Sequence, residues 1–318
     1  MPGFDPDKLL IVLGMPRGGT TSLYHIFDQH PYCFVPFRKE TSYFSWNSDK
    51  GEKWFKGLYS DRPDDQPGMD ISPQYFVDLR CIDRIKALAP NAKCILSVRD
   101  PVPWIMSLFF QTNNFDHKPS FAQFVDSYTI TTAHEVLHCS LADGYVQRTI
   151  EKFRESFGAN LLLYRFELFR DDPLRVLTAI EEFGGMQPYF TERNLNAVKV
   201  NSGLRYNWRW LYWLLSREAV ITGIDTVFPR PFIRKVRLAV DKATMLKTLP
   251  EDVPLTEEEK QLAEQRFAPD RAWVDELFAE HTIQLGDGTP FEPGQISGKA
   301  KPSHTGRSAT SAKAVAHP

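Results

Sequence analysis

Residues 9–22 have the sequence LLIVLGMPRGGTTS, which predicts a strand, a glycine-rich loop and the start of a helix. The aliphatic run that opens it does not alternate, as in a strand buried on both faces of a parallel sheet, although such a run also suits a buried helix. Gly14, Gly18 and Gly19 interrupt the run, and Thr20–Ser22 are good helix-starting residues. This order gathers backbone N–H groups and the positive end of a helix dipole around one point. The stretch therefore predicts a site for a phosphate or other oxyanion, against the simpler alternative of an ordinary strand-to-helix turn.

The loop differs from those of nucleoside triphosphatases at one position. Gly14 and Gly19 have the spacing of a Walker loop, but Thr20 and Thr21 follow where Lys and a hydroxyl residue are expected. A phosphoryl-transfer enzyme needs that Lys on the transferred phosphate, usually with a metal beside it. The cation within this loop is Arg17. We therefore expect a phosphate-binding loop that does not belong to a kinase and needs no metal.

The composition is that of a soluble globular protein. The 318 residues are 42% hydrophobic and 25% charged with a net charge of -2, so nothing in the overall charge favours nucleic acid as a partner. We predict a single domain over residues 1–285 and a disordered tail without a catalytic part over 286–318, where Gly, Pro, Ser, Ala and Lys dominate. Without an evident leader or an apolar segment near the roughly 20 residues of a membrane span, we expect a cytoplasmic protein.

Strands and helices alternate through much of the chain. Apolar strands are predicted at Lys93–Val98 and Leu161–Tyr164, and helices at 79–88, 143–157 and 172–183. This pattern predicts an α/β fold, P-loop-like, with three α/β/α layers around a central, mostly parallel sheet. A further short strand is predicted at 32–35. Near the end, Thr256 and Glu259 form a predicted capping box for a helix to about Phe267, and another helix is predicted to restart at Pro269-Asp270 and to run to about His281.

Polar residues follow the predicted strands, where ligands bind in open α/β sheets. Arg99-Asp100-Pro101 ends the strand at 93–98, and Arg165-Phe166-Glu167 ends the next. Between the first helix and these strands, residues 43–59 are rich in aromatic side chains, for which core packing is favoured over a wall facing an acceptor.

In order and spacing, these segments resemble the sulfotransferases that use 3′-phosphoadenosine 5′-phosphosulfate. Met15–Ser22 is similar to the family's 5′-phosphosulfate loop, and Ser97–Pro101 with Ser107 to its 3′-phosphate motif. Lys39–Phe44 resembles the Lys-Glu segment of carbohydrate sulfotransferases. Two further segments, Asp70–Phe76 and Phe267–Asp270, resemble their acidic-Lys-Ser/Thr-Pro-x-Tyr segment and the start of their final helix.

The resemblance implies a role for each matching residue. Glu40 would be the general base, and Arg17 would stabilise the leaving phosphate. The nucleotide would be bound by the loop and the second motif, that is by Arg17, Gly18, Gly19, Thr20, Thr21, Ser22, Arg99 and Ser107. The donor would be 3′-phosphoadenosine 5′-phosphosulfate, without a metal, and the acceptor a hydroxyl on a carbohydrate or glycolipid.

The chain departs from the family pattern in two places. Ile71 stands where many glycosaminoglycan enzymes have Lys, whose contact is either missing or supplied by Lys39. The family's late glycine-rich loop over the adenosine is not evident, and 201–205 is the nearest candidate. Simpler explanations also exist: Glu40 as a surface ion pair with Arg38 or Lys39, and Arg99 and Ser107 as a loop charge and a helix cap.

Residues 134–138 have the sequence HEVLH, the H-E-x-x-H signature of zinc peptidases. On a helix, His134 and His138 would share a face and could bind zinc, with Glu135 as the base. The third ligand would have to be Glu151 or Glu155, so a coincidence on a helix surface is the favoured explanation. The remaining histidines and the four cysteines are dispersed, which predicts neither a disulfide framework nor a metal cage.

Residues 193–247 contain eleven Lys or Arg against three Asp or Glu, and the stretch includes Trp208, Trp210 and Trp213. A basic, aromatic stretch of this kind, most evident over 205–238, could bind a nucleotide, a sugar chain or a membrane surface, or could be a packed helix with a solvated face. The alternatives to a sulfotransferase are a nucleotide-dependent kinase, the zinc peptidase and a non-catalytic nucleotide- or glycan-binding protein. The oligomeric state has no signature in the sequence.

Overall fold

The computed structural model describes residues 4–112, 119–131, 136–195 and 255–294. Its main sheet has the strand order β2 (Gly68–Ile71), β1 (Leu9–Gly14), β3 (Lys93–Val98), β6 (Leu161–Arg165) and β7 (Ile283–Leu285). Neighbouring strands from β2 to β6 are parallel, and β7 is antiparallel to β6. The prediction of a central, mostly parallel sheet is confirmed.

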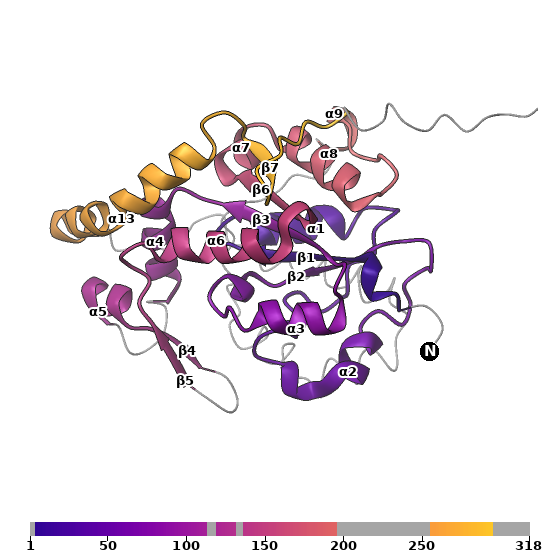
Figure 1. Cartoon of the computed structure of the whole chain (residues 1–318), viewed down its shortest axis with the longest axis horizontal. Coiled ribbons are helices and arrows are strands. Elements are labelled where there is room, and N and C mark those ends of the chain that lie inside the picture. The colour runs from indigo at the N-terminus through magenta and orange to yellow at the C-terminus, as the bar shows by residue number, and fades with distance from the viewer. Residues whose placement is uncertain (1–3, 113–118, 132–135, 196–254, 295–318) are drawn as a thin grey trace, which may run out of the picture.

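Helices connect and cover these strands (Figure 1). They are α1 (Thr20–Phe27), α2 (Gly51–Gly57), α3 (Cys81–Leu88), α4 (Pro101–Thr112), α5 (Phe121–Asp126), α6 (Tyr145–Phe157), α7 (Phe166–Asp171), α8 (Pro173–Gly184), α9 (Glu192–Leu195) and α13 (Glu257–Leu277). The predicted helices 79–88, 143–157 and 172–183 correspond to α3, α6 and α8, each displaced by two residues or fewer at its ends.

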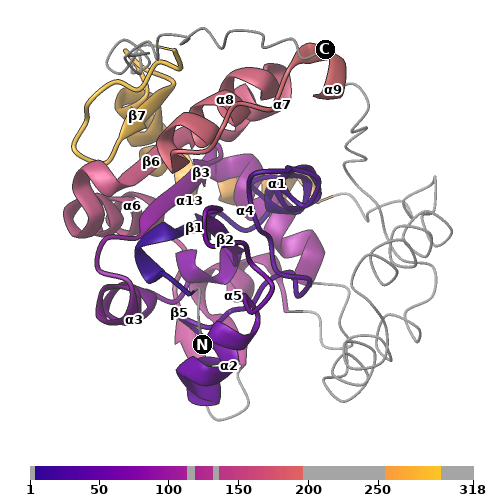
Figure 2. The same cartoon turned by 90° about the vertical axis from the view of Figure 1, so that its right-hand side faces the viewer.

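The sheet separates two apolar cores. Alternate residues of a strand point to opposite faces, so Leu10 and Val12 of β1 pack with the core of α1 and α8, whereas Leu9 and Ile11 pack with that of α3 and α6. Figure 2 shows the strands between these two groups of helices. Burial on both faces explains why β1 has an unbroken aliphatic sequence.

The predicted strand at 32–35 is not formed. Phe34 makes one isolated parallel bridge to Gly68, and the chain around it runs without a ladder. The segment also contains Pro31 and Pro36, and because proline has no N–H to give, it cannot support a regular ladder.

The H-E-x-x-H segment does not form the expected helix. Val136–Cys139 is strand β5, which pairs antiparallel with β4 (Tyr128–Thr131) in a hairpin beside α5. His134 and Glu135 lie outside the described residues. Within the described ranges, no group of three or more His, Cys, Asp or Glu is arranged to hold a metal.

The helix near the C-terminus is continuous, so the predicted break at Pro269 is wrong. Pro269 lies inside α13, which begins after Thr256 and ends at Leu277. The capping box of Thr256 and Glu259 is confirmed. Packing on both sides of the proline holds the helix together: the buried Phe267 ring meets the Trp104 ring edge-to-face, and Val274 is fully buried.

The packed chain also extends past Gly286, where the predicted tail would begin. Phe291 is buried, its N–H donates to the carbonyl of Ile283 at 3.1 Å, and Glu292 accepts two hydrogen bonds from Arg175. Composition alone placed the boundary too early, because this segment contributes few but well-buried side chains. Residues 295–318 lie outside the described chain.

Among the helices that the structure describes, none combines the length and the apolar character needed to cross a bilayer.

Candidate active site

The loop that follows β1 is tied to the end of β3. The N–H of Met15 donates to the carbonyl of Ser97, and the Ser97 hydroxyl donates to the carbonyl of Gly18, at 2.9 and 2.8 Å. Gly14 has a φ of +136°, and a Cβ there would lie 2.9 Å from the Cβ of Phe76. The glycine therefore permits the close approach between the loop and the chain that follows β2.

Helix α1 begins at the other end of the loop without a side-chain cap. Its N-cap is Gly19, in the left-handed region at a φ of +82°. The carbonyl of Gly19 accepts a backbone hydrogen bond from the N–H of Leu23 at 3.0 Å. The N–H groups of Thr20–Ser22 belong to the first turn, which has no acceptors of its own within a helix. An oxyanion is a suitable partner for such groups.

Two arginines and a serine meet at this loop. Arg17 Nε donates to the Ser107 hydroxyl at 2.9 Å, and Arg99 Nη1 donates to the carbonyl of Arg17 at 2.9 Å. The Arg99 guanidinium also lies 5.1 Å from the centre of the Phe166 ring. Burial, and then the nearby charge of Arg17, lower the pKa of Arg99. An anion bound between the two guanidinium groups would relieve this repulsion.

Arg17 itself has a φ of +61°, outside the ordinary range for a side chain of its size. Such backbone conformations persist where the surrounding structure fixes them, and they concentrate at binding sites.

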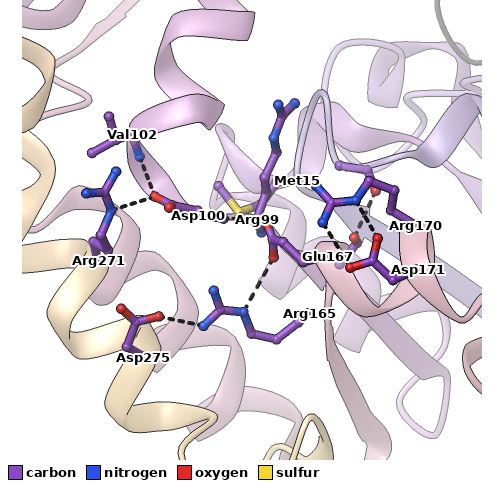
Figure 3. A network of polar contacts seen from close by, with 12 residues as sticks. Met15, Arg99, Asp100, Val102, Arg165, Glu167, Arg170, Asp171, Arg271 and Asp275 are labelled. Carbon is purple, nitrogen blue, oxygen red and sulfur yellow. Dashed lines mark hydrogen bonds and ion pairs between the residues drawn. The ribbon is translucent and has the colours of Figure 1, made fainter. Parts of the chain in front are cut away.

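The residue after Arg99 fixes the end of β3 (Figure 3). Asp100 Oδ1 accepts from the N–H of Val102 in the first turn of α4 and from Nε of Arg271 on α13, at 3.0 and 2.9 Å. Glu167 on α7 accepts from the N–H of Asp100 at 3.2 Å. Three helices thus hold the backbone that carries Arg99.

Glu40 lies in a different part of the site and is ion-paired. Its Oε1 is 2.5 Å from Nζ of Lys39, as the simpler explanation of this residue anticipated. Its Oε2 accepts a hydrogen bond from Nε2 of Gln74 at 2.7 Å, in the short 3-10 turn Pro73–Phe76 that follows β2. The Glu40 side chain is 30% exposed. The carboxylate is therefore both held in place and open to solvent.

A buried carboxylate anchors the Glu40 segment to β2. Asp70 accepts hydrogen bonds from the hydroxyls of Tyr75, Ser72 and Thr41, at 2.6, 2.8 and 2.9 Å. The Ser72 hydroxyl in turn accepts from the N–H of Ser42 at 3.0 Å. Burial raises the pKa of Asp70, while these hydroxyl groups act in the opposite direction. Ile71, by contrast, is buried in the core on the α1 face, so it makes no polar contact to a ligand.

Sequence reasoning missed Trp104 and Gln74 as parts of the site. The indole N–H of Trp104 donates to the carbonyl of Pro16 in the loop at 3.0 Å. The available signal was position alone: Trp104 lies in the first turn of the helix after a strand end, and Gln74 follows the proline of a polar turn. The aromatic segment is mainly core, as predicted, since Tyr43, Phe44, Phe55 and Tyr59 are buried.

Two predicted binding segments cannot be placed. The adenosine-loop candidate at 201–205 and the basic, aromatic stretch at 205–238 lie outside the described residues.

Fold and site together define an α/β protein with a glycine-rich loop and an uncapped helix start at the carboxyl ends of its parallel strands. Comparison with known proteins narrows this class. Residues 53–192 match the model of the Sulfotransferase family, a segment that contains Asp70, Arg99 and Ser107 but neither the loop nor Glu40.

Curated relatives are similar over a larger part of the chain. Human heparan sulfate glucosamine 3-O-sulfotransferase 3B1 is 26% identical over 186 residues, which are 58% of this chain and 47% of that protein. Mouse heparan sulfate glucosamine 3-O-sulfotransferase 6 is 26% identical over 204 residues, covering 62% and 58%. The chain thus spans about half the length of the curated relatives it matches.

Among solved structures, a sulfotransferase from Alicyclobacillus acidocaldarius superposes with a TM-score of 0.44 at 17% identity, over 59% of this chain and 87% of that one. The family model and the curated relatives agree: residues 53–192 are similar to the Sulfotransferase family, and the chain is distantly similar to heparan sulfate 3-O-sulfotransferases.

Proposed function

We propose that this protein transfers a sulfuryl group from 3′-phosphoadenosine 5′-phosphosulfate to a hydroxyl group. The observation that carries the proposal is the meeting of Arg17, Arg99 and Ser107 at the uncapped start of α1. The match of residues 53–192 to the Sulfotransferase family favours sulfuryl transfer over phosphoryl transfer at such an anion site.

The residues present fit the nucleotide. Its 5′ end is assigned to Arg17 and the N–H groups of Gly19–Ser22, and its 3′-phosphate to Arg99 and Ser107. The N–H of Gly18, which was also predicted to bind the nucleotide, donates instead to the carbonyl of Met15 at 2.9 Å. The lowered pKa of Arg99 beside Arg17 indicates two cations close enough to share one polyanionic ligand. The donor, when bound, supplies an activated sulfuryl group on its 5′-phosphate.

Glu40 is assigned the proton transfer. It takes the proton of the acceptor hydroxyl while that oxygen forms a bond to sulfur. The bond from sulfur to the 5′-phosphate oxygen breaks, and its electron pair stays on that oxygen. Arg17 and the loop N–H groups stabilise the charge that develops there. The products are a sulfate ester and adenosine 3′,5′-bisphosphate, and Glu40 returns its proton to water.

We assign the acceptor hydroxyl to a carbohydrate or glycolipid. The support is that the two curated relatives are heparan sulfate sulfotransferases and that Glu40 follows Lys39, as in the carbohydrate sulfotransferases that this segment resembles.

Calorimetry tests the nucleotide site. Adenosine 3′,5′-bisphosphate should bind without magnesium, and Arg99→Ala should reduce the preference for it over adenosine 5′-monophosphate by roughly tenfold or more, since hydrogen bonds to charged groups contribute about 1.5–3 kcal/mol. Tighter binding of ATP with magnesium would contradict the proposal and favour a kinase.

Glu40→Gln tests the base. We expect the rate of labelled sulfate transfer to fall by about 100-fold or more, because general bases typically contribute that much, with the affinity for adenosine 3′,5′-bisphosphate unchanged. The acceptors tested would be a heparan sulfate oligosaccharide, a glycolipid and p-nitrophenol. Glu52→Gln, a change in an exposed pair with Lys56, is the matched control. A fully active Glu40→Gln variant would show that another group takes the proton.

A further inference from the structure

The Glu40 carboxylate is held by donors from two separate parts of the chain. Lys39 is the preceding residue, whereas Gln74 lies 34 positions later in the turn Pro73–Phe76. The two donors occupy different oxygen atoms, Oε1 and Oε2, so they restrict both the position and the rotation of the carboxylate.

The two donors do not restrict Glu40 equally. Lys39 is the residue next to Glu40 in the chain, and an ammonium group on a flexible four-carbon stem imposes little direction on its partner. Gln74 belongs to a turn that packs directly on the loop: a Cβ on Gly14 would lie 2.9 Å from Phe76 Cβ and 3.0 Å from the carbonyl of Pro73. The hydrogen bond from Gln74 therefore ties Glu40 to the loop that holds Arg17.

Both ends of this hydrogen bond rest on one buried network. Asp70 accepts from Ser72 and Tyr75, which flank Gln74, and from Thr41, which follows Glu40. Charged groups that interact with Glu40 include Lys39, by contact, and Asp70, whose pKa the Glu40 charge helps to raise. Gln74 is a neutral donor to the same carboxylate.

We propose that Gln74 is the positioning residue for the general base, fixing the Glu40 carboxylate relative to the anion-binding loop. The inference rests on the proposed function. It gives a role to a residue for which neither the sequence motifs nor the family match supplies one. An amide suits the task because it donates a directed hydrogen bond to a carboxylate without neutralising its charge.

Gln74→Met tests the inference, because it keeps the length of the side chain and removes the donor. We expect kcat for labelled sulfate transfer to fall roughly tenfold, with the affinity for adenosine 3′,5′-bisphosphate and the melting temperature close to those of the wild type. Gln66→Met is the matched control, since the Gln66 amide donates to a backbone carbonyl on the surface. Wild-type kcat in Gln74→Met, or an equal loss of kcat and nucleotide affinity, would overturn the positioning role.

Gln74→Glu tests the pH profile of kcat, which would not change if Gln74 had only a structural role. A second carboxylate at hydrogen-bond distance would share a proton with Glu40, so the acidic limb of the kcat profile should move to higher pH by about one unit or more. An unmoved limb would contradict the inference. Absence of both nucleotide binding and transfer in the wild type would overturn the proposed function and this inference with it, whereas an active wild type with an unaffected Gln74→Met overturns the inference alone.

Discussion

Asp70 anchors the Glu40 side of the site. It is fully buried, and three hydroxyl groups from three positions converge on its carboxylate. Burial nevertheless raises its pKa above the ordinary value of an aspartate. The folded state therefore binds a proton on Asp70 more tightly than the unfolded chain does. Ionisation of Asp70 in the folded state costs more free energy than in the unfolded chain.

This arrangement predicts a pH dependence of stability. With a raised pKa in the folded state, the contribution of Asp70 is fully present below its unfolded pKa of about 3.9 and is lost as the pH rises through the folded value. Asp70→Asn cannot ionise, so we expect it to destabilise the fold by about 1–3 kcal/mol near pH 4 through an unsatisfied buried donor, and the gap to the wild type should narrow toward pH 7. Urea unfolding at a series of pH values measures this gap. A gap that stays constant or widens would refute the argument, and the exposed Asp65→Asn serves as the control.

Helix α13 shows how one element can serve two purposes. Its Asp270 is fully buried and accepts from the N–H of Gln147 in the first turn of α6 at 2.9 Å, where the N-cap Gly144 supplies no side chain. Its Arg271 binds Asp100 beside Arg99. Helix α13 thus caps the first turn of α6 and also holds Asp100, the neighbour of Arg99 in the predicted nucleotide site.

Removing Asp270, which caps α6 from α13, should lower the free energy of unfolding more than removing Asp275, which forms a surface ion pair from the same helix. We expect Asp270→Ala to lower the free energy of unfolding by about 1–2 kcal/mol, as for other helix caps. Asp275→Ala removes a pair with Arg165 whose aspartate is 56% exposed, and should cost less than about 1 kcal/mol. Denaturant unfolding of the two variants compares them directly. Equal costs would mean that Asp270 does not act as a cap.

At the scale of the whole molecule, strand order brings the site together. β1 lies between β2 and β3, so the loop after β1 meets Arg99 after β3 on one side and the turn of Gln74 after β2 on the other. Far along the chain, β7 closes the opposite edge, and residues 286–294 pack against α8 through the pair of Glu292 with Arg175.

Two shortened chains test whether this last segment is part of the domain. A chain ending at Leu285 should be less stable than one ending at Gly294 by about 3 kcal/mol, because it lacks the buried Phe291 ring. Both chains lack residues 295–318, so thermal or urea unfolding of the pair isolates 286–294. Equal stability would support the earlier boundary at Gly286.

The sequence by itself determined the elements whose signals are local. The unbroken aliphatic run of β1, the glycines at its end and the capping box at Thr256 depend on neighbours in the chain, and the structure confirms each of them. The same locality predicted the sheet type and pointed to Arg17 and Arg99 as candidates, whereas Ser107 and Glu40 became candidates through the family resemblance.

Only the tertiary structure decided which of these residues meet and where local rules fail. Pro269 remains inside a helix because Phe267, Asp270 and Arg271 are held by other elements, and HEVLH lies in part on a strand because β4 pairs with it. Arg17 reaches Ser107 across 90 positions, and Glu40 reaches Gln74 across 34. Such contacts are set by strand order and by close approaches such as that of Gly14 to Phe76, which no short window of sequence encodes.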